Sequence, residues 1–492
     1  MASCAGSTQA SPPDDTKRPK PLPAVATTIA PEEPVDGGVL RVAVDDLGSL
    51  DPLAVNIGSA ANLLVVDLVF DGLTDVRAGE RDASPAIASR WSANNDLDVW
   101  TFEIDPERTF ADGTPITVDD VVFSLDRTRK SFALIWQSLT AIESVEALDD
   151  TTVEIALNQP TAGLAELLAA PSAAIVPEAL VTAAPATFTT QPVGSGPFGA
   201  VETTSDGVTL TATSEDVRLS AVEVVDAGSV RAAWDLQQQG EVDMAVVPED
   251  EPSTAEVVET PFRAELFFGI NVNRRSLRDP AVRRAIVASV DSVQVTEAVL
   301  GDRAVPASGI GVDADACGRV CDQDRDSARA LVAALEDEVP VLHVDHRDDP
   351  IEKELADAIV VDLQAAGFTA TARAHGAEEY SEFLVSGDTE IFRFGHVGVD
   401  PVGDAYLPLM FGSDAQNNVT GFGSAAVDQD MADAAARGTW DELESELMTD
   451  SAPVIPVARY VSRWAVSDRV SDLEIDRDGT FDPTSVAVVE TE

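Results

Sequence analysis

The clearest pattern of apolar and polar positions lies in residues 99–127. Trp100, Phe102 and Ile104 alternate with polar residues, which predicts a strand with one buried face. Further along, Thr117 is followed three residues later by an aspartate, the spacing of a helix capping box. Apolar residues then recur at helical spacing. The stretch therefore predicts a strand, a turn and a capped helix.

A second pattern predicts how the later part of the chain is built. An apolar strand at 341–344 is followed by a helical pattern at 351–366, which Gly367 ends, and by an alternating strand at 368–374. A strand, helix and strand in this order predict a parallel pair joined by a right-handed crossover. We therefore expect an α/β fold. Because 492 residues exceed one ordinary core, we also expect two or more lobes.

Six short motifs occur in an order that resembles a known family. They are SLDP at 49–52, FDGL at 70–73, WTF at 100–102, FADGTP at 110–115, FSLDR at 123–127 and GSGPF at 194–198. The chain resembles the family 5 extracytoplasmic solute-binding proteins, the peptide- and nickel-capturing receptors of ABC importers. The resemblance extends from about Gly38 to Val466.

The resemblance implies a division into lobes. We expect an α/β, two-lobed periplasmic-binding-protein-like fold of type II, with a hinge between the lobes and the extra subdomain of the peptide-binding class. Residues 1–36 would form a lipoprotein N-terminus and a Pro-rich tether. The remaining expected parts are lobe I (37–55, 190–266 and 458–492), its extra subdomain (56–189) and lobe II (267–457).

Candidate ligand-binding residues follow from the same resemblance. Residues 393–401 resemble a second-lobe loop of peptide binders, in which an Asp pairs with the peptide's ammonium and an Arg meets its carboxylate. Arg393, His396 and Asp400 are the corresponding candidates here, although Val399 holds the usual position of the Asp and His396 that of a Trp. An ordinary surface pair is the alternative for Arg393 and Asp400. For His396 the alternatives are a metal ligand and a packed or stacking histidine.

In the first lobe, the resemblance points to Asn56, Ile57 and Gly58, whose backbone can pair with an extended peptide. It implies a receptor that captures an oligopeptide or dipeptide in a cleft between the lobes and delivers it to an ABC transporter permease. A nickel complex, a sugar or another small solute is the alternative ligand. We expect a monomer that needs no cofactor.

A secreted hydrolase is the alternative from a different class. The chain has four histidines and no HExxH, GxSxG or P-loop pattern, so the sequence offers no recognisable nucleophile with its base and no metal cluster. We therefore expect a binding protein and no enzyme.

The charge balance excludes some partners. Asp and Glu number 87 against 32 Lys and Arg, which gives a formal net charge of −55 at pH 7. Such a surface repels nucleic acids and anionic lipid headgroups. The composition is typical of a protein that works in high salt, and a codon bias towards Asp, Ala, Val and Arg is the alternative explanation.

Salt adaptation is testable, because screening by salt relieves repulsion between like charges. If the acidic surface is an adaptation to salt, the melting temperature should rise strongly between low and molar salt. A flat response, measured by thermal denaturation across that range, would leave codon bias as the explanation.

The three cysteines bear on localisation. Cys317 and Cys321 lie four residues apart, and a local disulfide, which would indicate an oxidising compartment, is weighed against two free thiols. Cys4 resembles the end of a bacterial lipobox, with a stray N-terminal cysteine as the alternative. No apolar run is long enough to span a bilayer. We therefore expect an extracytoplasmic protein, held at the cell membrane by an N-terminal lipid.

Overall fold

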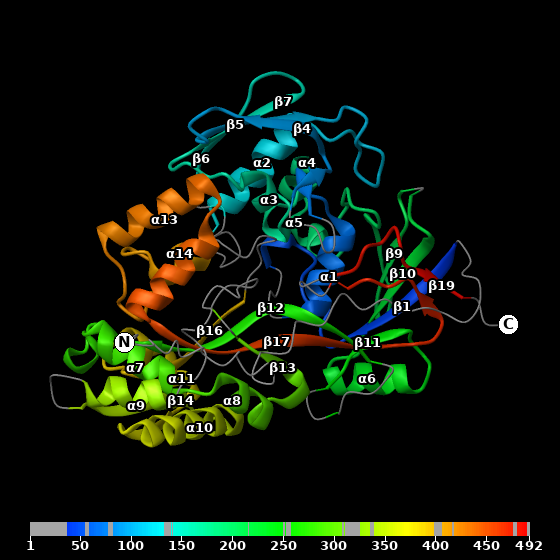
Figure 1. Cartoon of the computed structure of the whole chain (residues 1–492). Helices are drawn as coiled ribbons and strands as arrows, with labels where there is room; N and C mark the ends of the chain where they lie inside the picture. Colours follow the sequence, from blue (N-terminus) through cyan, green and yellow to red (C-terminus); the bar gives the residue numbers. More distant parts are fainter. Residues whose placement is uncertain are drawn as a thin grey trace, which may run out of the picture.

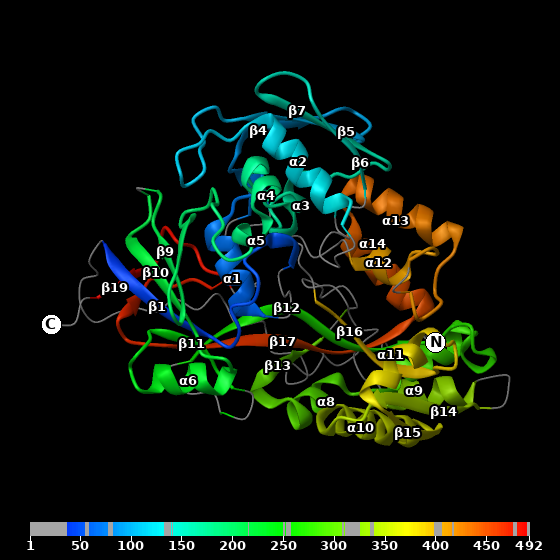
Figure 2. The same cartoon turned by 180° about the vertical axis from the view of Figure 1, so that it is seen from behind.

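The computed structural model describes residues 37–54, 59–76, 82–131, 139, 141–214, 216–248, 251, 257–307, 309, 325–334, 339–397, 406–415, 418–475 and 480–489. Figures 1 and 2 show the arrangement of its helices and strands from opposite sides. Three predictions from the N-terminal part and the cysteines fall outside these residues: the tether, the lipid on Cys4 and the disulfide between Cys317 and Cys321.

One large sheet runs through the whole molecule. Within the described residues it has 11 strands in the order β15-β14-β16-β12-β17-β11-β1-β10-β9-β8, and β13 (Ala304–Pro306) pairs with β17 beside this path. Its centre is formed by two long antiparallel strands, β12 (Val257–Ile270) and β17 (Val454–Val466). In Figure 1 these two strands cross the middle of the molecule and join its two halves.

The first half of the sheet carries helices on both faces. Its strands are β1 (Gly38–Val44), β8 (Ala200–Thr203), β9 (Gly207–Thr211), β10 (Leu219–Asp226) and β11 (Met244–Val246). Val42 and Val44 belong to the core that includes helix α1 (Ala60–Val69), whereas Ala43 packs with α6 (Val230–Gln238). This alternation is the period of two that a strand imposes on its side chains.

A separate four-stranded sheet confirms the first sequence prediction. Its order is β4 (Ala88–Ala93), β5 (Val99–Ile104), β7 (Thr152–Leu157) and β6 (Ile142–Ala147). Trp100, Phe102 and Ile104 are buried, as the alternation predicts. Helix α2 (Val118–Arg129) begins with a complete capping box between Thr117 and Asp120. The short elements around it are β2 (Thr74–Asp75), β3 (Ser84–Pro85), α3 (Leu164–Leu167), α4 (Glu178–Ala183) and α5 (Pro185–Phe188).

The predicted β-α-β unit is confirmed in the second half. Strands β14 (Val341–Arg347) and β15 (Thr369–His375) are parallel and joined by α10 (Pro350–Ala366), which Gly367 ends in the left-handed conformation. The other elements of this half are α7 (Pro280–Ser289), α8 (Ser292–Val299), α9 (Arg325–Ala333), α11 (Ala377–Val385), β16 (Ile391–Val397), α12 (Tyr406–Phe411), α13 (Ala425–Arg437) and α14 (Trp440–Glu446).

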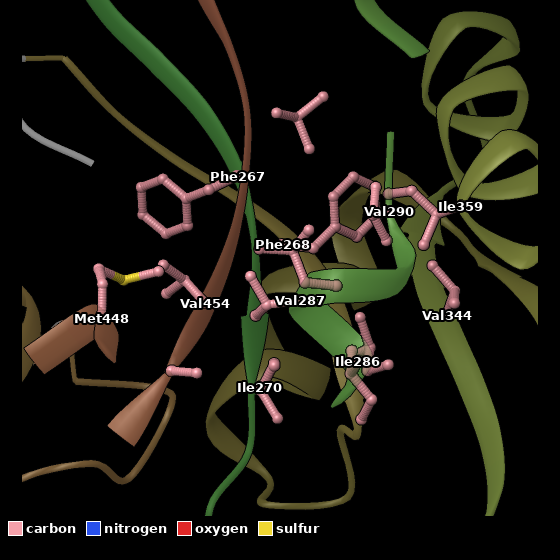
Figure 3. Close-up of a cluster of buried hydrophobic side chains, with 14 of the residues drawn as sticks. Phe267, Phe268, Ile270, Ile286, Val287, Val290, Val344, Ile359, Met448 and Val454 are labelled. Atoms are coloured by element: carbon pink, nitrogen blue, oxygen red, sulfur yellow. The ribbon is translucent and has the colours of Figure 1, made fainter. Parts of the chain in front are cut away.

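In this half both faces of β12 are buried. Figure 3 shows Phe267 pointing towards Met448 and Val454, and Phe268 on the opposite side with Val290 and Ile359. A strand covered on both faces carries a continuous apolar run, which explains the sequence LFFGI at 266–270. The end of β12 is thus fixed between two layers of helices.

The two halves also meet away from the long strands. The backbone N–H of Ala162, which follows β7, donates to the carbonyl oxygen of Ala435 in α13 at 2.8 Å. Figures 1 and 2 both show α13 next to the four-stranded sheet. The second half is therefore joined to the first through β12 and β17, and it contacts the four-stranded part through α13.

Candidate functional site

At the junction of β12, β16 and β17, two charged residues lie opposite each other in neighbouring strands. The pairing of β12 with β17 is irregular between Pro261 and Glu265, where β12 carries extra residues. Glu265 then lies opposite Arg459 in β17 and opposite His396 in β16. β16 ends at Val397, three residues before Asp400 in the sequence. Glu265 therefore occupies the same rung of the sheet as one predicted ligand residue.

Glu265 is a buried carboxylate. The residue is 4 % exposed, and neither carboxylate oxygen has a hydrogen-bond partner among the described residues. The closest approach to Arg459 is 4.0 Å, between Nε and a carboxylate oxygen, and the Arg459 side chain is also buried. Burial raises the pKa of Glu265 well above its usual range; the Arg459 guanidinium opposes this effect and the Glu444 carboxylate adds to it.

Glu444 links this junction to the helices above it. It lies in α14 and is buried, and its carboxylate accepts a hydrogen bond from the hydroxyl of Tyr406 at 2.9 Å. Glu265 and Phe267 lie on the same face of β12, because β12 pairs with β16 without a break over this stretch. That face is the one towards Met448, which follows α14 (Figure 3).

Arg393, the predicted carboxylate partner, lies on the other side of the sheet. It is opposite Phe268 in the β12–β16 ladder, and its Nε lies 3.8 Å from a carboxylate oxygen of Glu352 in α10. Its guanidinium also donates to the carbonyl oxygen of Phe394, and the Tyr380 hydroxyl donates to the carbonyl oxygen of Arg393 at 2.7 Å. The side chain is 15 % exposed, so it differs from an ordinary surface arginine.

The other predicted ligand residues cannot be placed as side chains. Asn56, Ile57, Gly58 and Asp400 lie outside the described residues, and of His396 only the backbone position in β16 is described. Glu265 and Arg459 were missed by the sequence analysis. Their signal was a single charged residue within each of two short apolar segments, AELFF in β12 and PVARY in β17.

The sequence motifs meet in a second place, a crevice of about 880 Å³ between the large sheet and the four-stranded part. The Arg108 guanidinium binds the carboxylate of Asp71, and the backbone N–H of Asp71 donates to the Ser195 hydroxyl at 3.2 Å. Burial raises the pKa of Asp71 to about 6, with the nearby Arg108 opposing the shift. Three of the motifs thus line one crevice: FDGL, FADGTP and GSGPF.

Among the described residues, no group of three or more His, Cys, Asp or Glu side chains could hold a metal ion. Within the same part of the chain, no helix is both long and apolar enough to cross a membrane.

Comparison with known proteins gives related sequences over most of the chain. The chain is 24 % identical over 447 residues to the dipeptide-binding protein DppE of Bacillus subtilis (strain 168), covering 80 % of this chain and 81 % of the relative. It is 23 % identical over 478 residues to the "Probable di/tripeptide-binding protein 5" of Pseudomonas aeruginosa (strain UCBPP-PA14), covering 86 % and 90 %.

A solved structure supports the fold. The unliganded open form of MppA, described as a periplasmic murein tripeptide binding protein, superposes with a TM-score of 0.80 at 20 % identity, covering 95 % of this chain and 99 % of that one. The predicted two-lobed α/β fold is therefore confirmed. The model of the bacterial extracellular solute-binding proteins, family 5 Middle, matches residues 82–418. This protein belongs to the family 5 extracellular solute-binding proteins.

Proposed function

We propose that this protein binds a short peptide between its two lobes and delivers it to an ABC transporter permease. The observation that carries the proposal is the family match over residues 82–418, together with relatives named for binding dipeptides and tripeptides. A family of solute-binding proteins needs a site between movable lobes and no catalytic groups. We therefore propose a binding protein that leaves its ligand chemically unchanged.

The proposed mechanism is closure about the two long strands. β12 and β17 connect the halves, so a change in their twist would rotate one half against the other. The contact between Ala162 and Ala435 lies away from these strands and would open and close with that rotation. A ligand that touches both lobes favours the closed state by its higher affinity for that state.

The proposed ligand contacts would pair the two charged ends of a bound peptide. A peptide enclosed between lobes has to have both its charged ends paired. Arg393 remains our candidate for the carboxylate end and Asp400 for the ammonium end. Glu352 lies beside the Arg393 guanidinium, which keeps this buried cation close to an anion.

A thermal-shift screen tests the proposal. Dipeptides, tripeptides, longer peptides, nickel complexes and oligosaccharides are added in turn to the purified protein. A ligand at a hundred times its dissociation constant should stabilise the fold by about 2.7 kcal/mol. We expect a shift with peptides that Arg393→Ala abolishes. Arg347→Ala is the matched control, because Arg347 also binds Glu352 but is about half exposed.

The outcomes separate the alternatives. If only nickel complexes or sugars shift the melting temperature, the protein is still a solute receptor, but its ligand is not a peptide. No shift with any compound, at low or high salt, would contradict the binding function. A peptidase and esterase assay on the same preparation tests the hydrolase alternative, and turnover would contradict our proposal.

We also propose that the protein is a monomer outside the cytoplasm, anchored by a lipid on Cys4. The family is extracellular, and a tether at residues 5–36 would let the receptor stand away from the membrane. Radioactive fatty acid should label the wild type in cells and leave Cys4→Ser unlabelled. Labelling of both would place the lipid elsewhere, and labelling of neither would contradict the anchor.

A further inference from the structure

We propose that the crevice between the large sheet and the four-stranded part binds a linear organic polyamine, whose ammonium groups lie against the acidic residues of the lining. The crevice has a volume of about 880 Å³, and ligand pockets commonly measure about 300–1,000 Å³. It is separate from the proposed peptide site. Every described residue of its lining belongs to the first half of the molecule, whereas the peptide site lies between the two halves.

The crevice is formed where several segments of the first half meet. They are the C-terminal end of α1, the connection between β5 and α2, the turn at 195–197, the connection between β9 and β10, and residues 482–484. Figures 1 and 2 show β9 and β10 on the opposite side of α1 from α13 and α14. A molecule bound in the crevice would therefore contact both the large sheet and the four-stranded part, and no described residue of the second half.

The lining of the crevice has an excess of negative charge. Among its described residues, one is basic, Arg108, and six are acidic: Asp67, Asp71, Asp75, Glu107, Asp216 and Asp482. The end of α1 adds to this excess, because a helix carries partial negative charge at its C-terminus and the last turn of α1 has no basic residue. A cleft lined by one sign of charge concentrates ions of the opposite sign. The crevice therefore favours a cation with more than one charge.

Asp71 shows that the excess of negative charge has an energetic cost. Burial raises the pKa of its carboxyl to about 6, the Arg108 guanidinium bound to it opposes the shift, and the Asp75 carboxylate adds to it. A raised pKa means that the ionised form of the carboxyl is disfavoured at this place. A further cation in the crevice would favour the ionised form, so its binding would reduce this cost.

The arrangement of the lining favours an extended organic cation over a metal ion. A divalent metal needs several oxygen ligands that converge at about 2.0–2.6 Å, and the described residues hold no group of three or more side chains that could bind one. The lining also contains the partly exposed apolar side chains of Pro197, Val217 and Pro483. A linear polyamine alternates ammonium groups with methylene chains, so it matches a lining in which acidic and apolar side chains both occur.

Titration calorimetry with spermidine at physiological ionic strength tests the proposal. The wild type is compared with the double variant Glu107→Gln with Asp216→Asn, which changes one exposed acidic residue on each of the two parts that border the crevice. We expect one saturable site in the wild type and an affinity about tenfold weaker in the variant, because two exposed charge contacts are lost. The double variant Glu143→Gln with Glu146→Gln is the control. It removes the same charge from exposed positions on β6 outside the crevice and should bind like the wild type.

The controls distinguish a site from general attraction to a chain with a formal net charge of −55. Equal weakening in both double variants, or no saturable binding to the wild type, would overturn the proposal. Magnesium chloride is titrated in the same way. If Mg²⁺ binds the wild type equally well and shows the same loss in the crevice variant, the site does not select polyamines and the proposal fails. None of these outcomes depends on whether the protein binds peptides.

A second measurement uses the wild type alone and is independent of the folding of any variant. A carbodiimide joins an amine to a carboxylate that lies beside it, and peptide mass spectrometry then locates the attached spermidine. At low spermidine concentration we expect attachment at Glu107, Asp216 or Asp482 before other positions. Attachment spread evenly over the exposed acidic residues of the chain would overturn the proposal.

Discussion

Arg127→Ala is expected to lower the free energy of unfolding by about 3 kcal/mol, because it leaves a buried carboxylate without its partner. Arg127 in α2 binds Asp51 through both terminal guanidinium nitrogens, with Nη1 at 3.0 Å from one carboxylate oxygen. The two side chains are 21 % and 11 % exposed, so water screens the pair only weakly. The guanidinium carbon also lies 5.9 Å from the centre of the Phe188 ring.

The same substitution should also weaken ligand binding. Asp51 lies a few residues before Asn56, Ile57 and Gly58, the predicted first-lobe contacts. Arg127 belongs to the four-stranded part, so the pair fixes the chain just before these residues against a second unit of the structure. We therefore expect Arg127→Ala to weaken peptide binding even at temperatures where the variant remains folded.

Urea denaturation and a double-mutant cycle measure this effect. Asp51→Ala should cost a similar amount, and the double variant should cost less than the sum, since the two residues interact directly. Arg90→Ala is the control, because the Arg90 and Glu103 side chains are 74 % and 42 % exposed and such surface pairs contribute less than about 1 kcal/mol. Equal losses for Arg127→Ala and Arg90→Ala would contradict the prediction.

The pair of Arg127 and Asp51 shows what two of the sequence motifs do in the structure. Asp51 comes from SLDP and Arg127 from FSLDR, and the structure joins them in one ion pair. Asp71 of FDGL and Ser195 of GSGPF are likewise joined by a hydrogen bond. Four of the motifs thus contact one another in pairs although they lie far apart in the sequence, and this explains why their presence could predict the fold.

The buried charged residues at the junction of β12 and β17 were harder to predict for a physical reason. A strand shows its period of two locally, as Trp100 and Phe102 do, and a helix end such as Gly367 is set by neighbouring residues. The charged groups that act on Glu265 lie in β17 and α14, more than 170 residues further along the chain. These contacts depend on which strands pair in the large sheet and in which register. That register could not be predicted from the sequence.

Gly194→Ala is expected to destabilise the protein by about 3 kcal/mol, because an added methyl group would collide with backbone. A Cβ atom at this position would lie 1.8 Å from the carbonyl oxygen of Val69 in α1. The backbone of Gly194 cannot easily move away. Its N–H donates to the carbonyl oxygen of Gly199 at 3.0 Å, and its own carbonyl oxygen accepts from the N–H of Ala111 at 2.9 Å.

The position matters because the chain here returns from the four-stranded part to β8 of the large sheet. Gly228→Ala is the matched control: Gly228 has a φ of 74°, and no atom lies within 4 Å of its added Cβ. That control should cost only the strain of the left-handed conformation, about 1 kcal/mol. Urea denaturation followed by far-ultraviolet circular dichroism compares the two variants. If Gly194→Ala were as stable as Gly228→Ala, α1 and the GSGPF turn would have to move apart freely, and the close backbone contact would not be needed to hold the four-stranded part in place.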